Sequence, residues 1–126
     1  MQKLTIPGRL DGLNEIIKAN RTNLYLGAKL KKDNERVVTD CITIYRLHPE
    51  TEPVFLKFTW VEPNRKRDKD NIASAKKMVL DALVQTQILS NDGWKNIIGF
   101  SDAFEIDKEN PRIELEIIPE SELKGE

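Results

Sequence analysis

The sequence has few of the residues that secreted, membrane or zinc-binding proteins need. Its 126 residues include one cysteine, Cys41, and one histidine, His48. A single cysteine excludes a disulfide within the chain, and by itself it cannot make a zinc cluster. No apolar run approaches the length that spans a bilayer, and the first residues lack the apolar core of a signal peptide. We therefore expect a cytoplasmic protein that forms one domain over residues 1–126.

The chain also has little net charge, but its charges are unevenly distributed. The formal net charge is −1, from 20 basic and 21 acidic residues. Residues 99–126 hold nine acidic and three basic side chains, a balance of −6, so the rest of the chain carries +5. Most of that surplus lies in residues 64–77, where six basic side chains accompany two aspartates. A local surplus of this kind attracts phosphates, although an ordinary solvated loop has the same pattern.

Hydrophobic periodicity predicts alternating strands and helices. Two-residue alternation and turn residues indicate strands, and apolar residues three and four apart indicate helices. The expected elements are a strand at 3–6, a loop at 8–15, a helix at 22–46, a strand at 54–62, a helix at 70–86, strands at 95–106 and 112–118, and a frayed tail at 119–126. The order β-α-β-α-β-β predicts an α+β fold, in which two main helices pack on one side of a mixed sheet.

Aromatic residues are few, at 6% of the chain, and most are expected in the core. Trp60 alternates with Phe58 on one face of the strand at 54–62. We also expect Phe100 and Phe104 to be buried. Trp60 and Trp94 have rings that could stack on nucleic-acid bases, but core packing is the favoured role for both.

Two aspartates stand where the basic segment meets the second predicted helix. Asp68 and Asp70 are two residues apart, so in an extended segment both point the same way. On a helical wheel that starts at Asp70, Lys77 and Asp81 share its face, while Lys76 lies on the flank of the apolar face. Asp92 follows in the turn after the helix, and a helix of about 25 Å separates it from Asp70 unless the connection folds back or a second subunit completes the site.

Oxygen ligands without histidine or cysteine suit magnesium, manganese or calcium rather than zinc. A calcium-binding EF-hand starting at Asp68 is excluded, because Ile72, Ala73 and Val79 replace required ligands and the required glycine. Magnesium held by carboxylates beside basic residues is the usual arrangement for phosphoryl chemistry. The alternative is that Asp70 caps the helix and the other charges are simply solvated.

The stretch "RDKDNIASAKKMVLDAL" and the following "SNDGW" resemble the RusA-type Holliday junction resolvases. The signature of that family is D-x-D-N, a lysine in the next helix, D-A-L, and two aspartates in the turn beyond. The matching positions here are Asp68, Asp70, Asn71, Lys77, Asp81-Ala82-Leu83 and Asn91-Asp92. The opening "PGRLDGLNE" also resembles the family's N-terminal loop, with Asn14 at the matching asparagine.

The sequence departs from the family pattern in three places. The usual lysine position is occupied by Ser74, and the lysines follow two and three residues later. The interval from D-x-D-N to D-A-L is three residues longer than in the family, which is close to one helical turn. Asn91 replaces the first aspartate of the pair, which leaves Asp92 as the ligand. We select Lys77 as the catalytic lysine, with Lys76 as the alternative.

The resemblance implies a magnesium-dependent endonuclease that acts as an intertwined homodimer and cuts four-way DNA junctions by paired symmetric nicks in recombination and repair. Asp68, Asp70 and Asp92 would hold Mg²⁺, for which Mn²⁺ can substitute, with Asp81 as a further ligand or supporting group. Lys77 would stabilise the charge that develops on the attacked phosphate. The residues expected to contact DNA are Arg65, Lys66, Arg67, Lys69, Lys76 and Asn14.

Three alternatives to a junction resolvase remain open at this stage. The first is a nuclease for other branched DNA, such as flaps and forks. The second is a non-catalytic module that binds junctions. The third is a protein–protein adaptor with a charged surface.

Overall fold

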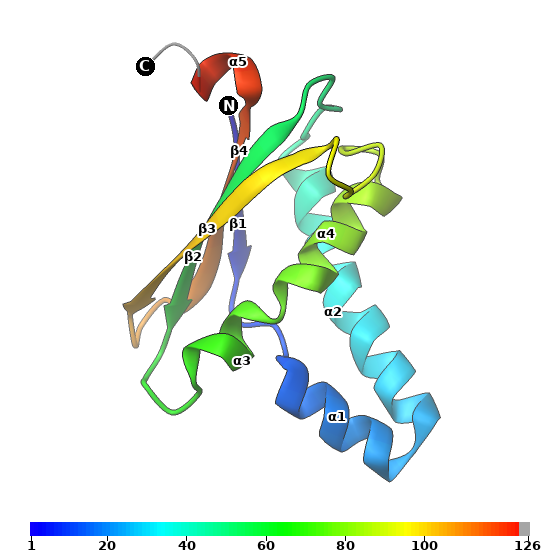
Figure 1. Cartoon of the computed structure of the whole chain (residues 1–126). Helices are drawn as coiled ribbons and strands as arrows, with labels where there is room; N and C mark the ends of the chain where they lie inside the picture. The colour runs from blue at the N-terminus through cyan, green and yellow to red at the C-terminus, as the bar shows by residue number, and fades with distance from the viewer. Residues whose placement is uncertain (124–126) are drawn as a thin grey trace.

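The computed structural model describes residues 1–123 and confirms an α+β fold with a four-stranded mixed sheet. The elements in chain order are β1 (Gln2–Pro7), α1 (Leu13–Thr22), α2 (Leu24–Ile44), β2 (Val54–Glu62), α3 (Lys69–Ala73), α4 (Lys76–Gln85), β3 (Ile97–Ile106), β4 (Arg112–Pro119) and α5 (Glu120–Leu123). Figure 1 shows α1 to α4 on one side of the sheet. None of the helices in the described part is long and apolar enough to cross a membrane.

The sheet has the strand order β1-β4-β2-β3. Strands β1 and β2 both run antiparallel to β4, whereas β3 runs parallel to β2. Parallel neighbours need a crossover connection, and α3 and α4 supply it. Strand β3 is an edge strand, because it stands last in the strand order. The basic segment before α3 is the first part of the crossover connection.

One face of the sheet is the core face, and its residues follow the predicted alternation. Leu56, Phe58 and Trp60 of β2 are each at most 1% exposed, and Trp60 stacks on Phe58 at 5.2 Å between ring centroids. Ile113, Leu115 and Ile117 of β4 are also buried. The opposite face carries charged residues, as expected for an antiparallel pair with one face in water.

The first predicted helix, at 22–46, is confirmed as α2, and the helix α1, which was not predicted, precedes it with a break at Asn23. Asn23 has extended backbone angles (φ −172°, ψ 141°), and its side chain accepts a hydrogen bond from the Leu26 N–H at 3.2 Å. Asn23 is thus the N-cap of α2, which is a favoured position for asparagine. The prediction of a loop over residues 8–15 was wrong at its end, because α1 begins at Leu13. There the Glu15 carboxylate accepts the N–H of the N-cap residue Gly12 at 3.1 Å.

The second predicted helix, at 70–86, is divided into α3 and α4, but its two ends match the prediction to within one residue. At the division between α3 and α4, the Ser74 hydroxyl donates to the Asn71 carbonyl at 2.5 Å and accepts from the Leu13 N–H at 2.7 Å. Serine bonding to a preceding carbonyl bends a helix. After α4, Gln87 adopts a positive φ of 62°, and the N–H groups of Ile88 and Leu89 both return to the Leu83 carbonyl. The chain therefore turns back along α4.

The tail was predicted to be frayed, but residues 120–123 form the short helix α5. The Met1 amino group pairs with Glu122 at 2.6 Å, and the Ser121 N–H and hydroxyl both donate to Glu52. These contacts tie the last described turn to both the N-terminus and the loop before β2. The rest of the predicted tail, residues 124–126, lies outside the described residues.

Candidate metal and phosphate site

The segment between β2 and α3 exposes several cations without neutralising them. We call residues 63–69, which run from the end of β2 to the first residue of α3, the basic loop. Arg65, Lys66 and Lys69 are exposed. Within residues 1–123 none of the three forms an ion pair, and Lys69 has only a long cation–π contact of 5.5 Å to the Phe104 ring. These side chains remain available to a negatively charged ligand.

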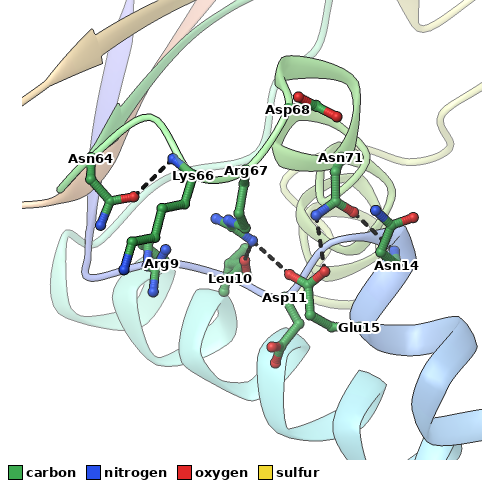
Figure 2. A pocket seen from close by; sticks show the side chains of 10 residues that line it. All are labelled: Arg9, Leu10, Asp11, Asn14, Glu15, Asn64, Lys66, Arg67, Asp68 and Asn71. Atoms are coloured by element: carbon green, nitrogen blue, oxygen red, sulfur yellow. Dashed lines mark hydrogen bonds and ion pairs between the residues drawn. The ribbon is translucent and has the colours of Figure 1, made fainter.

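Arg67 belongs to the same loop but has a different environment. Its guanidinium donates to both Glu62 oxygens, at 3.1 and 2.8 Å, and to Glu15 and the Leu10 carbonyl at 2.9 and 3.0 Å. The Arg67 side chain is 17% exposed and that of Glu62 only 6%. Figure 2 shows the Arg67 guanidinium turned toward Glu15 below the loop. Four of its five N–H donors are engaged, so we expect Arg67 to hold the loop in place rather than to grip phosphates.

Asn71, the last residue of the D-x-D-N motif, ties α3 to α1. Its amide donates to Glu15 at 2.9 Å, and its side-chain oxygen accepts the Asn14 N–H at 2.9 Å. A Cβ atom at Gly12 would lie 2.3 Å from the Asn71 carbonyl oxygen, so only glycine fits there. The backbone of Asn14 is therefore fixed beside the motif. Its side chain lines a cavity of about 760 Å³ together with Lys66 and Asp68.

The charge of Glu15 is stabilised strongly enough to affect folding. Burial alone raises the pKa of Glu15, but hydrogen bonds from Asn71, Gly12 and Arg67 outweigh it and lower the pKa from 4.5 to about 2. A carboxyl with a lowered folded-state pKa stabilises the fold above its unfolded pKa and loses that contribution as the pH falls through the folded pKa. The stabilisation by Glu15 is therefore complete above about pH 4.5 and is lost between about pH 4.5 and 2.

We expect Glu15→Gln to destabilise the protein at pH 7, with a deficit that shrinks toward pH 2. Because the Glu15 side chain is 32% exposed, screening limits the loss to about 1–2 kcal/mol. Urea unfolding from pH 7 down to pH 2 measures this dependence. Glu109→Gln, at an exposed site, is the control and should change the unfolding free energy little. A deficit for Glu15→Gln that stays constant across the range would contradict the assignment.

Asp68 and Asp70 lie at the end of the basic loop and line a second cavity of about 820 Å³ with Arg65 and Lys69. Asp68 is the N-cap residue of α3, but its side chain makes no capping hydrogen bond. The Asp68 carboxylate forms no other hydrogen bond or ion pair within residues 1–123. One Asp70 oxygen accepts the N–H of the next residue at 2.8 Å. The prediction that Asp70 caps the helix was wrong, because α3 begins at Lys69 and its N-cap residue is Asp68. Capping therefore explains neither carboxylate.

The connection after α4 folds back far enough to bring Asp92 to Lys77, in the first turn of α4. Because α4 ends at Gln85 and the chain turns back, the Asp92 carboxylate lies 3.6 Å from Lys77 Nζ. Lys77 also pairs with Asp81 at 2.9 Å, as the shared helix face predicts. The hydrogen bond to Asp81, followed by its charge and then that of Asp92, raises the pKa of Lys77, so this ammonium stays protonated.

The acidic residues form two groups, Asp68 with Asp70 and Asp81 with Asp92. Backbone hydrogen bonds run from the Ser74 N–H to the Asp70 carbonyl and from the Lys77 N–H to the Ser74 carbonyl. These bonds reach only Lys77, and Asp81 lies 11 residues after Asp70. The backbones of the two groups are therefore separated by about three helical turns, or roughly 16 Å. Within residues 1–123, no three His, Cys, Asp or Glu side chains gather closely enough to hold a metal ion. The ligand set of Asp68, Asp70 and Asp92 stays a prediction.

Lys76 packs against the sheet instead of pointing toward the basic loop. Its ammonium donates to Asp102 at 2.7 Å and lies 4.0 Å from the centroid of the Phe100 ring. Its side chain is 14% exposed. The other Asp102 oxygen accepts the Trp60 indole N–H at 2.7 Å. This arrangement favours a structural role for Lys76 and leaves Lys77 as the lysine available for chemistry.

The predictions for two aromatic residues were wrong. Trp94 was expected in the core but is 100% exposed, and Phe100 is 49% exposed. Phe100 belongs to β3, which has a neighbouring strand on one side only within residues 1–123, and Trp94 lies in the turn before β3. Trp60 is buried as predicted, at 1% exposure, and Phe104 is partly buried.

Sequence reasoning also missed Glu15 and Glu62, which position Arg67. The alternation that buries Leu56, Phe58 and Trp60 continues to position 62, so it places a glutamate on the core face. That signal was present in the sequence. The sequence does not show which residue pairs with Glu62, because Arg67 has the same residue type and setting as the other cations of the basic loop.

Comparison of the chain with known protein families finds no matching family, and comparison with curated proteins finds no similar one.

Proposed function

We propose that this protein is a magnesium-dependent endonuclease that cuts branched DNA, four-way junctions above all. The observation that carries the proposal is the charge arrangement at the basic loop. Exposed charges of opposite sign in one loop can pair with one another, although each such pair contributes little stability. Here the Asp68 carboxylate has no partner in the described part of the chain, and Arg65, Lys66 and Lys69 form no ion pairs there. A divalent cation would neutralise the carboxylates, and a phosphate would neutralise the basic side chains.

The donor set fits magnesium. Magnesium is commonly held by one or two carboxylates, with phosphate oxygens and waters as its other ligands. Asp68 and Asp70 line one cavity and offer only oxygen atoms. The bound ion would lower the pKa of a coordinated water and screen the charge of the attacked phosphate. Asp92 would join as a ligand either by a shift within its own chain or from a second subunit.

Lys77 is proposed to stabilise the phosphate during cleavage. Its side chain is 65% exposed, and exposed ion pairs contribute at most about 1 kcal/mol. Moving its ammonium from Asp81 and Asp92 to a phosphate therefore costs little. Release of Lys77 would also free Asp92 to bind the metal.

Arg65, Lys66, Lys69 and Asn14 are proposed to hold the DNA on either side of the cut. Their side chains border the two cavities that flank Asp68. Contacts with phosphates release counterions, so affinity should fall steeply as salt rises. A four-way junction has approximate two-fold symmetry, and a homodimer would place two such sites on opposite strands.

A non-catalytic junction-binding module is the second candidate. The absence of a three-carboxylate group in residues 1–123 favours it. A nuclease for flaps or forks would use the same residues on a different substrate.

Cleavage of labelled DNA separates these candidates. We expect Mg²⁺ or Mn²⁺ to support two symmetric nicks in a four-way junction and Ca²⁺ to support binding without cleavage. Flap, fork and linear duplex substrates of the same sequence test the preference for junctions. Light scattering should give twice the chain mass of 14.5 kDa. Junction binding without cleavage in any metal would identify a binding module. A protein that neither binds the junction nor responds to metal would refute both the nuclease and the binding module.

A further inference from the structure

Trp94 is the most exposed large apolar side chain of the described residues. It is 100% exposed, whereas Tyr25 is 71% and Phe100 49% exposed. Scattered exposed apolar residues are normal on a protein surface, so exposure alone does not indicate a binding site. Trp94, however, borders a shallow cavity of about 340 Å³. A fully exposed indole beside a cavity is a ready stacking surface.

The cavity suits a flat ring. Trp94, Phe100, Ile98 and Leu80 line it with apolar surface. Gly93 also lines it, and a Cβ atom there would meet nothing within 4 Å, so the backbone at this point is open. Aromatic rings pair well with other flat π-systems in such surroundings.

The position of the cavity indicates which ring would enter it. Asp92 lines the cavity and contacts Lys77, and the proposed function places both residues at the scissile phosphate. A group bound against Trp94 therefore lies next to that phosphate. In DNA the flat group nearest a phosphate is a nucleobase.

We propose that Trp94 stacks on an unstacked nucleobase next to the cleaved phosphate and thereby selects branched over continuous DNA. In a continuous duplex both faces of each base are covered by its neighbours, so a protein ring must first unstack a base. At a branch point the free-energy cost of unstacking a base is smallest. Base stacking on aromatic side chains also tolerates any base. This inference rests on the proposed function and adds the residue that recognises the branch.

The two tryptophans of the chain make the test direct. Trp60 is buried and hydrogen-bonded to Asp102, so a change in fluorescence on adding DNA reports on Trp94. With Ca²⁺ present, a four-way junction should quench the emission, and the quenching should vanish in Trp94→Phe. Trp94→Ala should weaken binding to the junction about ten-fold or more and change binding to linear duplex little. Trp94→Phe keeps a ring and should retain most of the affinity.

Tyr25→Ala, at another exposed aromatic residue, is the matched control and should leave junction binding unchanged. The inference fails if Trp94→Ala binds the junction like the wild type. It also fails if Trp94→Ala changes the molar mass in light scattering, because Trp94 would then lie between two copies of the chain. If the wild type cuts junctions in either case, the nuclease assignment survives. A wild type that neither binds nor cuts branched DNA refutes both.

Discussion

Asp70→Asn is expected to abolish magnesium-dependent cleavage, with a loss of about 10³-fold or more, while junction binding is kept or strengthened. Removing one of two carboxylates from a magnesium site forfeits several kcal/mol of charge stabilisation, and each 1.36 kcal/mol is a factor of ten in rate. Binding should not suffer, because a charge that repels phosphate is lost. The substitution is conservative for the fold, since asparagine keeps the oxygen that accepts the Asn71 N–H.

Single-turnover cleavage and binding in Ca²⁺ measure the two effects separately. Asp40→Asn is the matched control, because Asp40 is an exposed aspartate of α2 and its loss removes the same charge. It should cut at the wild-type rate. Normal cleavage by Asp70→Asn would refute the metal assignment. Equal losses in both variants would mean that net charge, and not a metal site, governs activity.

Arg67→Ala is expected to lower the free energy of unfolding by about 3 kcal/mol, corresponding to roughly 10 °C in melting temperature. The substitution leaves the carboxylate of Glu62, which is 6% exposed, without its bidentate partner. Arg9 lies 3.4 Å from that carboxylate and compensates only in part, because its side chain is 43% exposed. The hydrogen bonds to Glu15 and Leu10 are lost at the same time.

Arg65→Ala, two residues away, provides a sharp contrast. Arg65 is exposed, so its loss should leave the melting temperature unchanged but weaken DNA binding and its salt dependence. A double-mutant cycle of Arg67→Ala with Glu62→Gln should give a coupling of more than about 1 kcal/mol. If Arg65→Ala and Arg67→Ala have the same effect on stability, Arg67 is an ordinary loop cation and not the tie between the loop and the core.

Local patterns predicted the strands well and the helices less well. The strand at 54–62 has the predicted bounds, because the alternation ends at a proline and depends only on neighbouring residues. The helix boundaries differ where a side chain bonds to distant backbone. Ser74, for example, bonds to Leu13 of α1, 61 positions away. No window of a few residues contains that partner.

The sequence by itself determined which residue types are available and where along the chain they lie: oxygen ligands without a zinc set, cations around Asp68 and Asp70, and strands that bury one face. These follow from composition and from the periods of strand and helix. Only the tertiary structure decided which charges are free. Arg67 is held by Glu15 and Glu62, Lys76 by Asp102, and Lys77 by Asp81 and Asp92, whereas Asp68 forms no ion pair within residues 1–123. The Lys77–Asp81 pair follows from the shared helix face. Arg67–Glu15 and Lys76–Asp102, in contrast, join residues 52 and 26 positions apart, which meet only in the folded chain.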